Sequence, residues 1–365
     1  MKILIVSASF FPENSPRSFR TTELVKEFCR QGHHVKLITA SNSVQYDDMM
    51  EKYRFEIKKL PKTKLPSFNW KGKISNIIRR GLEILFEYPN IEFYSSVKKA
   101  LKTEKGFDLM ISIAAPHSIH WGVAAATKKF GKAAKIWIAD CGDPFMGSKM
   151  DRIGKPFYFK YLEKSFCKNA DFITVPIEGA REAYYSEFRK KIIVIPQGFK
   201  FSETQGLLEE YQSNSVISFA YAGALSRGGR DPRPILEVLK KSERDFRFYI
   251  FTNASSILSP YDQELKDKII VSPYIPRKDL IKKLSKMDFL LNLENGVSEQ
   301  LPSKLIDYYL IGRPVLSLNS GHLDKTKLLD FLNRDFSAQY QFQNVSQYEV
   351  QNVVESFINL GQAKR

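Results

Sequence analysis

The chain has 365 residues, of which 43% are hydrophobic and 13% aromatic, a composition that supports substantial cores and excludes a disordered protein. Its formal net charge of +16 is one-sided: residues 1–200 contain 35 Lys+Arg against 20 Asp+Glu, and residues 201–365 contain 21 against 20. The first half is therefore expected to meet an anionic surface or substrate. Three widely spaced cysteines form no metal or redox motif and predict free thiols in a reducing cytoplasm.

The first apolar run, Ile3–Phe11, stops at Pro12 and Glu13 without a small-residue cleavage site. It is predicted to be a buried first strand rather than a signal peptide. No window reaches the roughly 18 apolar residues that a membrane span needs.

Short apolar runs rich in β-branched residues alternate with helical patterns. The expected strands are 3–8, 35–39, 108–113, 135–139, 171–175 and 192–195, then 216–222, 246–251, 269–272, 288–293 and 314–318. The expected helices include 17–31, 118–130, 155–169, 232–242, 277–286 and 303–311. Apolar strands that alternate with helices predict an α/β fold whose doubly wound parallel sheets are covered on both faces.

A polar, turn-rich segment at 195–215 separates the two sets of strands. We therefore expect two Rossmann-like domains that face each other across a cleft, residues 1–198 and 199–346, with a last helix at about 347–361 packing back on the first. Ligands of such sheets bind beyond the carboxyl ends of the strands. The loops that follow the strands are thus the place to look for site residues.

The stretch ENGVSEQLPSKLIDYYLIGRPVLSL combines a loop with a helix that starts near Ser303 and ends at Gly312. A helix N-terminus exposes free N–H groups that suit a phosphate, and Lys304 adds a cation there. Glu299 and Asp307 flank this helix start, where they could accept hydrogen bonds from sugar hydroxyls on either side of a diphosphate. The alternative is a solvated helix start with two surface acids.

The same stretch resembles the E-x7-E signature of retaining glycosyltransferases of the GT-B fold, family 4, in the branch that reads PSKLxEYLAxGKPV. The resemblance implies that Glu299 holds hydroxyls of the donor sugar and that Asp307, one methylene shorter than the usual Glu, holds the ribose hydroxyls. The backbone of the helix start would meet the diphosphate: Leu301, Pro302, Ser303 and Lys304.

A second stretch, FAYAGALSRGGRDPRPILEVLKK, resembles the first strand and loop of that family's nucleotide domain. By this resemblance Arg227 and Arg230 would neutralise the departing β-phosphate, and Gly223 would let the backbone approach the ligand. Many family members carry Arg directly after the strand glycine, where this chain has Ala224, so the two arginines would share that role. The alternative is an ordinary basic surface loop.

The first half also resembles the family. In PENSPRSFRTTELVKEFCRQGHHVKLITA, Asn14 and Ser15 stand in the loop where relatives often have Gly-Gly, beside the donor. Arg17 and Arg20 lie on the first turn of the next helix, where they either face the cleft or are ordinary surface charges.

The segments SIAAPHSIHWG and KIWIADCGDPF resemble the SxxPxSxH and ADxRDPW segments of the branch. This implies that His117, with Asp143 in the next loop, acts on the acceptor or the transferring sugar. His120 is the poorer candidate because it sits further into the helix. Gly142 stands where relatives usually have Arg. A packed histidine and a turn aspartate are the alternatives.

The stretch SPYIPRKDL resembles the family loop that contacts the base, so Tyr274 and Ile275 are expected beside it. The sequence contains no DxD dyad of the type that holds Mg²⁺, no His/Cys motif for zinc and no Walker A motif. We expect no metal and no cofactor, with a UDP- or GDP-sugar as co-substrate.

Residues 52–105 mix basic residues with aromatic and aliphatic ones. The part from Lys71 to Phe86 predicts a helix with an apolar face and a basic edge, the pattern of a peripheral protein on anionic lipid. The alternative is a helix that packs on the sheet by its apolar face. No nucleic-acid module is recognisable, so no nucleic-acid partner is expected.

The leading hypothesis is therefore a retaining, metal-independent glycosyltransferase. The resemblance implies transfer from an NDP-sugar to a lipid-linked or oligosaccharide acceptor in the synthesis of capsule, O-antigen or a related surface polysaccharide. The alternatives are an epimerase or phosphorylase on the same fold, and a non-catalytic GT-B module that binds a sugar nucleotide or a partner.

Overall fold

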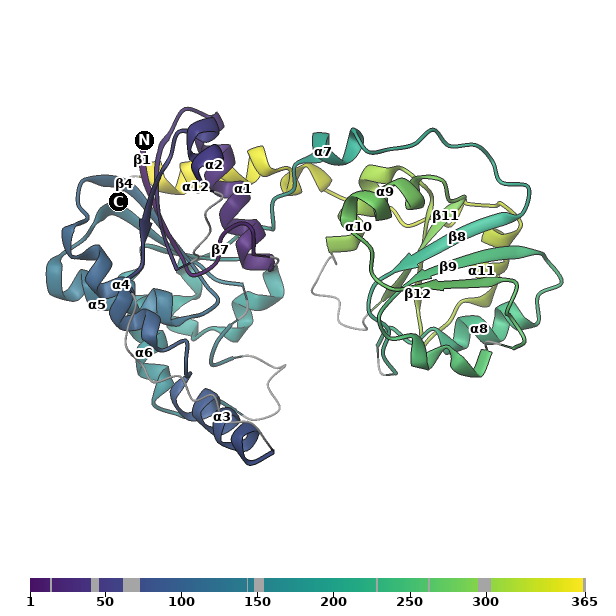
Figure 1. Cartoon of the computed structure of the whole chain (residues 1–365), viewed down its shortest axis with the longest axis horizontal. Helices are drawn as coiled ribbons and strands as arrows, with labels where there is room; N and C mark the ends of the chain where they lie inside the picture. The colour runs from purple at the N-terminus through teal and green to yellow at the C-terminus, as the bar shows by residue number, and fades with distance from the viewer. Residues whose placement is uncertain are drawn as a thin grey trace. The chain divides into compact units, whose positions relative to one another are not determined.

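The computed structural model describes residues 1–13, 15–40, 46–61, 73–142, 144–147, 154–227, 229–261, 263–294 and 303–363, with the backbone alone at 73–75 and 303. It divides into two compact units, Met1–Phe199 with Gln347–Arg365, and Lys200–Ser346. Each unit is built on one parallel sheet (Figure 1).

The sheet of the first unit has the strand order β3-β2-β1-β4-β5-β6-β7, and every neighbouring pair is parallel. Its strands are β1 (Lys2–Ser7), β2 (His34–Thr39), β3 (Glu56–Lys59), β4 (Phe107–Ile113), β5 (Ala134–Asp140), β6 (Phe172–Val175) and β7 (Ile192–Val194). The side chains of β1 alternate between two hydrophobic clusters: Leu4 and Val6 belong to one, Ile3 and Ile5 to the other. The sheet is therefore covered on both faces.

The α-helices described in the first unit are α1 (Pro16–Arg30), α2 (Tyr46–Tyr53), α3 (Lys73–Phe86), α4 (Glu92–Ala100), α5 (Ser118–Phe130), α6 (Phe159–Asn169) and α12 (Val350–Gln362). Ser15 caps α1, because its side chain accepts a hydrogen bond from the Ser18 N–H at 3.1 Å. The C-terminal helix α12 packs against α1, and Phe357 of α12 is fully buried.

The sheet of the second unit has the order β10-β9-β8-β11-β12 and is also parallel. Its strands are β8 (Ile217–Ala222), β9 (Phe246–Phe251), β10 (Ile269–Ser272), β11 (Phe289–Glu294) and β12 (Val315–Asn319). Its α-helices are α7 (Phe201–Gln205), α8 (Arg233–Lys240), α9 (Arg277–Ser285), α10 (Ser303–Ile311) and α11 (Lys325–Leu332). Phe219 of β8 stacks on Phe248 and Phe289 of the neighbouring strands, at centroid distances of 4.4 and 4.5 Å.

The prediction of two doubly wound, Rossmann-like parallel sheets is confirmed, and every predicted strand is present to within a residue or two. The short strand β3 was missed. Its sequence, EIKK, is polar and lies at the sheet edge, where it has no continuous apolar run to mark it. In the described part of the chain, no helix has the length and apolar character to cross a bilayer.

In both sheets the strand order reverses direction next to the first strand of the unit, between β1 and β4 and between β8 and β11. Such a reversal splays the loops that follow the two central strands and creates the usual ligand crevice of a doubly wound sheet. In the second unit these loops are the one after Ala222 and the one that leads from β11 into α10.

Candidate functional site

Helix α10 is fixed to the carboxyl end of β8 by a buried tyrosine. Tyr308 is 1% exposed, and its hydroxyl oxygen accepts a hydrogen bond from the Ala222 N–H at 3.0 Å. Residues four apart share one helix face, so the first turn of α10 points Lys304 at the same strand end. The Lys304 ammonium lies 4.3 Å from the centre of the Tyr221 ring.

Lys304 is a buried cation with an unusual environment. Its Nζ has no hydrogen-bond partner among the described residues. Burial, and secondarily the positive charge of Arg230, lower the pKa of Lys304 to about 7. A buried ammonium with no carboxylate to pair with is costly unless an anion approaches it.

Arg230 shares this feature, because its Nε is buried and makes no hydrogen bond within the described part of the chain. The loop that carries it is closed by a hydrogen bond from the Ser226 N–H to the Arg230 carbonyl at 3.0 Å. Lys304 and Arg230 thus bring two positive charges together at the end of β8, from two stretches far apart in the sequence.

The start of this loop requires glycine. Gly223 has φ +150°, and a Cβ there would come within 3.1 Å of the Tyr221 hydroxyl. That hydroxyl donates a hydrogen bond to the Ala224 carbonyl at 2.7 Å. The backbone after β8 therefore folds closely over Tyr221 and holds the ring in place under Lys304.

Arg227 lies exposed in the same loop. Hydrogen bonds from Arg233 are the main cause that lowers the pKa of Asp231, and the charge of Arg227 adds to the effect. Asp231 also accepts the Arg233 N–H at 3.0 Å, which fixes the junction between the loop and α8. Arg227 remains accessible to a ligand.

Asp307, the second acid of the signature, is paired. Its Oδ1 accepts from Arg277 Nη2 at 2.5 Å, and its Oδ2 from Arg277 Nε at 3.3 Å. Arg277 also donates to the Thr204 hydroxyl at 2.8 Å. The acid expected to hold the ribose hydroxyls is thus a carboxylate that a fork of the Arg277 guanidinium orients.

The two residues expected beside the base lie just before α9. Tyr274 is 51% exposed, and its N–H donates to the Asn253 side-chain oxygen at 3.1 Å. Ile275 packs against the apolar cluster that also contains Tyr308. Tyr274 thus offers an exposed ring on the same unit as Lys304 and Arg230.

In the first unit, Arg17 and Gly142 are neighbours. A Cβ on Gly142 would overlap the guanidinium of Arg17, and Arg17 Nη1 lies 4.0 Å from Asp140 Oδ2. The resemblance placed a family arginine at position 142. Here the guanidinium comes instead from α1 and covers the same backbone.

Arg20 was expected either to face the cleft or to be an ordinary surface charge, but it is buried inside the first unit. It is 2% exposed, and it binds both oxygens of Asp140, with Nε–Oδ2 at 3.1 Å and Nη2–Oδ1 at 2.9 Å. Its guanidinium also donates to the carbonyls of Ile195 and Pro196 and lies 5.2 Å from the ring centre of Phe357. Arg20 is a buried structural residue that joins α1, β5, the end of β7 and α12.

His117 lies directly before α5 and is 6% exposed. Its ring packs against His120 and Phe145, at centroid distances of 5.8 and 5.2 Å. His120, Cys141 and His117 bring their donor atoms within 4.8 Å of one another. Both ring nitrogens of His120 are already used in the core, by Ser112 Oγ at 2.8 Å and by Cys141 Sγ at 3.4 Å.

Several predicted residues lie outside the described residues: Glu299, Leu301, Pro302, Asn14 and Asp143. Their roles stay predictions. Of Ser303 only the backbone is described, as the first residue of α10.

Sequence reasoning missed three residues of this site: Tyr221, Arg277 and Tyr308. The apolar pattern marks Tyr221 and Tyr308 as buried positions. Nothing local shows that Tyr221 lies beside Lys304 or that Tyr308 binds the end of β8. Arg277 stands inside the stretch compared with the base-contacting loop, but only the fold brings it to Asp307.

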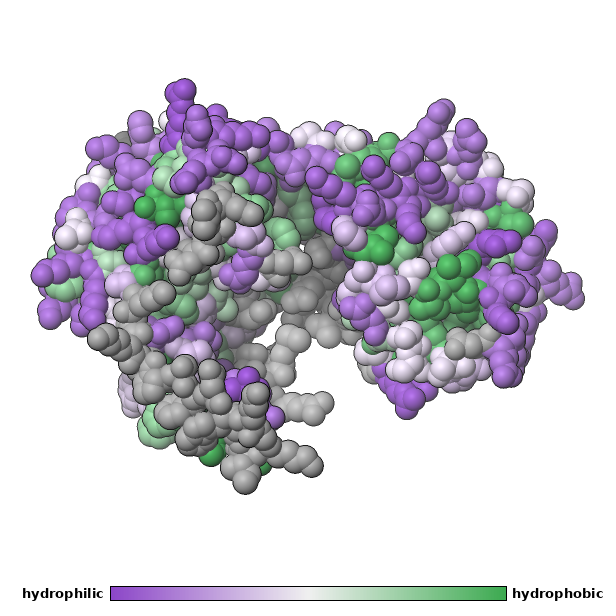
Figure 2. Space-filling view, viewed as in Figure 1, coloured by the Kyte–Doolittle hydropathy of each residue, from purple (hydrophilic) through white to green (hydrophobic). Residues whose placement is uncertain are grey.

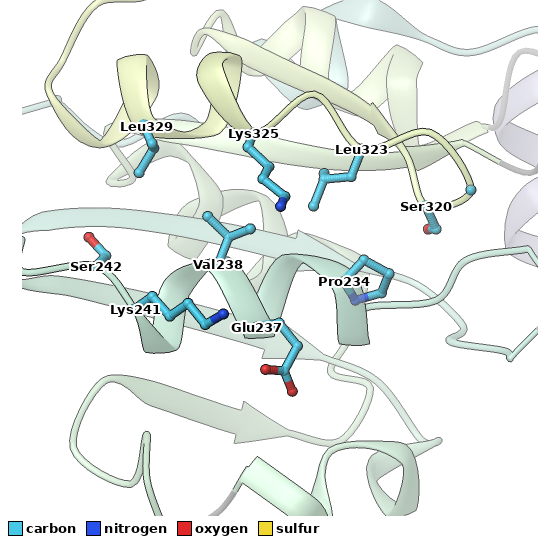
Figure 3. A pocket seen from close by; sticks show the side chains of 10 residues that line it. Pro234, Glu237, Val238, Lys241, Ser242, Ser320, Leu323, Lys325 and Leu329 are labelled. Atoms are coloured by element: carbon cyan, nitrogen blue, oxygen red, sulfur yellow. The ribbon is translucent and has the colours of Figure 1, made fainter.

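A groove of about 560 Å³ lies elsewhere on the second unit, between α8 and α11 (Figure 3). Val238, Leu323 and Leu329 line it together with Lys241 and Lys325. None of the predicted site residues lines this groove.

No protein-family model and no curated protein matched the sequence. Solved structures do match. The lipopolysaccharide outer core galactosyltransferase WaaB, in its apo form, has a TM-score of 0.59 and 14% identity over 99% of each chain. Anabaena Alr3699/HepE in complex with UDP and glucose has a TM-score of 0.53 and 10% identity over 99% of this chain and 97% of that one.

The UDP-GlcNAc 2-epimerase from Neisseria meningitidis bound to UDP-GlcNAc is also similar, with a TM-score of 0.53 and 14% identity over 99% of each chain. At such identities the likeness establishes the fold, which is GT-B with two Rossmann-like units. Function has to be argued from the site.

Proposed function

We propose that this protein is a retaining, metal-independent glycosyltransferase that moves a sugar from a UDP- or GDP-sugar to an acceptor hydroxyl. The observation that carries the proposal is the pair of cations Lys304 and Arg230, whose Nζ and Nε atoms are buried and have no hydrogen-bond partner among the described residues, at the reversal point of a doubly wound sheet. A diphosphate is the anion that supplies the missing counter-charge in a nucleotide-binding Rossmann-like unit.

The electrostatics explain how such a site would accelerate transfer. When the sugar leaves, negative charge grows on the β-phosphate. A low-polarity environment strengthens the attraction of Lys304 and Arg230 for this charge, and Arg227 adds to it from the exposed side of the loop. The diphosphate would then take the proton of the acceptor as the acceptor attacks from the same face, so that configuration is retained.

The remaining assignments follow the resemblance. Glu299 would hold the donor sugar, and Asp307 the ribose hydroxyls, with Arg277 fixing the orientation of its carboxylate. His117 and Asp143 would act on the acceptor side. Tyr274 and Ile275 would lie beside the base.

The acceptor is proposed to be lipid-linked, in the synthesis of capsule, O-antigen or a related surface polysaccharide, on a peripheral protein at the cytoplasmic face of an anionic membrane. Two of the similar solved structures support this direction: WaaB is a galactosyltransferase of the lipopolysaccharide outer core, and HepE was solved with UDP and glucose.

The test is a thermal-shift screen with UDP, GDP, dTDP and CMP, followed by turnover of the matching sugar nucleotide with and without EDTA. One diphosphate should raise the melting temperature, and transfer should be unaffected by EDTA. Glu299→Ala should abolish transfer with an unchanged melting temperature. Wild-type turnover in that variant would place the site elsewhere.

The likeness to a UDP-GlcNAc 2-epimerase favours a second candidate, a sugar-nucleotide epimerase. The products formed with and without an acceptor distinguish the two activities. An epimerase converts the sugar nucleotide without an acceptor and releases no diphosphate, whereas a transferase releases diphosphate in proportion to the acceptor that it glycosylates.

A further inference from the structure

Helix α3 exposes its apolar side chains. Ile77 is 72% exposed, Phe86 57% and Leu85 48%. This excludes the alternative that α3 packs on the sheet by its apolar face. Figure 1 shows α3 projecting from one end of the first unit. Away from α3, hydrophilic residues cover much of the described surface of this unit in the view of Figure 2.

A second group of exposed rings lies at the start of α6. Phe157 is 71% exposed and Tyr161 62%. Tyr158, between them, donates its hydroxyl to the Leu85 carbonyl at the end of α3, across 73 residues of sequence. A side-chain ion pair between Lys155 and Glu87, at 3.3 Å, joins the same two segments.

These contacts make one surface from two elements. It consists of Ile77, Ile78, Leu85, Phe86, Phe157, Tyr158 and Tyr161, and we call it the α3–α6 surface. Exposed apolar side chains gathered on two joined elements of a soluble protein mark a site of interaction.

The charges around it identify the kind of partner. Arg79 and Arg80 flank the apolar residues of α3, with side chains 67% and 70% exposed, and both lie near one carboxylate of the same helix, Glu83, at 4.0 and 3.2 Å, so that a net positive charge remains there. On α6, the Lys160 ammonium lies 5.1 Å from the Tyr161 ring centre. A second copy of the chain would bring these cations against their equivalents, whereas anionic lipid headgroups would neutralise them.

We propose that the α3–α6 surface docks on an anionic bilayer. Phe157, Tyr161 and Ile77 enter the boundary between headgroups and acyl chains, and Arg79 and Arg80 meet lipid phosphates. Tyrosine suits this depth because its ring is apolar and its hydroxyl is polar. The inference rests on the proposed function in one respect: it names the surface by which the transferase would reach a lipid-linked acceptor.

The test is co-sedimentation of the full chain with vesicles of phosphatidylglycerol and phosphatidylcholine, and with pure phosphatidylcholine. Wild type should bind the anionic vesicles at low salt and be released at high salt. The triple variant Ile77→Ser, Phe157→Ser, Tyr161→Ser should bind at least tenfold more weakly. Leu329→Ser, which removes a 41% exposed apolar residue of the second unit, should bind as wild type does.

A thermal shift with UDP and GDP on the same variants separates this proposal from the proposed function. An unchanged nucleotide response in the triple variant, with vesicle binding lost, supports the surface. Vesicle binding in a protein that binds no nucleotide would remove the proposed function and leave the surface standing. Equal vesicle binding by wild type and triple variant overturns the proposal, as does concentration-dependent dimerisation that only the wild type shows.

Discussion

The guanidinium of Arg17 lies where a side chain on Gly142 would have to be. The two residues come from α1 and from the loop after β5, so the absence of a side chain at one position makes room for the long side chain of the other. The arginine expected at position 142 from the resemblance is thereby replaced in space by Arg17.

Gly142→Ala should displace the Arg17 guanidinium. Because the far end of an arginine side chain moves easily, the free energy of unfolding should fall by only about 1 kcal/mol or less. If Arg17 contributes to the site, kcat/KM should fall much more than stability does. The control is Gly206→Ala, where a Cβ meets no atom closer than 3.5 Å. Unchanged kcat/KM in Gly142→Ala would remove Arg17 from the site.

Binding of a nucleoside diphosphate should weaken as the pH rises above 7. Burial holds the pKa of free Lys304 at about 7, and a bound diphosphate would raise it. Binding then takes up a proton, and the affinity should fall by up to about tenfold per pH unit between pH 7 and pH 9. Titration calorimetry in buffers of different ionisation enthalpy measures this uptake.

Lys304→Met is the matched variant. It should flatten the pH profile and weaken diphosphate binding. Since the lowered pKa means that the native state binds this proton less tightly than the unfolded state, wild-type stability should rise with pH between about 7 and 10.5. Lys304→Met should abolish that rise. A diphosphate affinity that stays constant from pH 7 to 9 in wild type would contradict the role of Lys304.

Glu163 of α6 should make stability depend on pH in the opposite sense. It is 1% exposed, it accepts the Met146 N–H at 3.2 Å, and burial raises its pKa to about 7. The native state therefore binds the proton more tightly, and stability should fall as the pH rises from about 4.5 through 7. Glu163→Gln, which mimics the protonated form, should remove a drop on the order of 2 kcal/mol in urea unfolding.

If Glu163→Gln leaves the pH dependence of unfolding as in wild type, Glu163 is not the group responsible. Glu209→Gln serves as the control, since Glu209 is an exposed acid of the second unit.

Arg20→Met should be among the most destabilising single changes. It leaves the Asp140 carboxylate buried without its bidentate partner, which costs about 3–5 kcal/mol. The double variant Arg20→Met, Asp140→Asn should recover part of that loss, because it removes the uncompensated charge. Urea unfolding of the single and double variants measures the coupling. Additive losses would show that the two residues act independently.

Most of the fold could be predicted from the sequence. Apolar runs such as those of β1 and β11 are buried on both faces, so each run by itself marks a central strand. The start of α10 and its end at Gly312 could also be predicted, because glycine is favoured just after the last turn of a helix. Gly312 adopts φ +72° there. The polar edge strand β3 gave no such signal, since its environment and not its composition makes it a strand.

The sequence by itself determined the alternation of strands and helices and the placing of Lys304 at a helix start, because these depend on neighbours in the chain. Only the tertiary structure decided which charges are paired. Arg20 and Arg17 share a helix turn, yet one is buried on Asp140 and the other is one-fifth exposed. Lys304 and Arg230 meet only because β8 and β11 are adjacent. Charge pairing and burial depend on contacts between distant segments, and these are fixed when the sheets form.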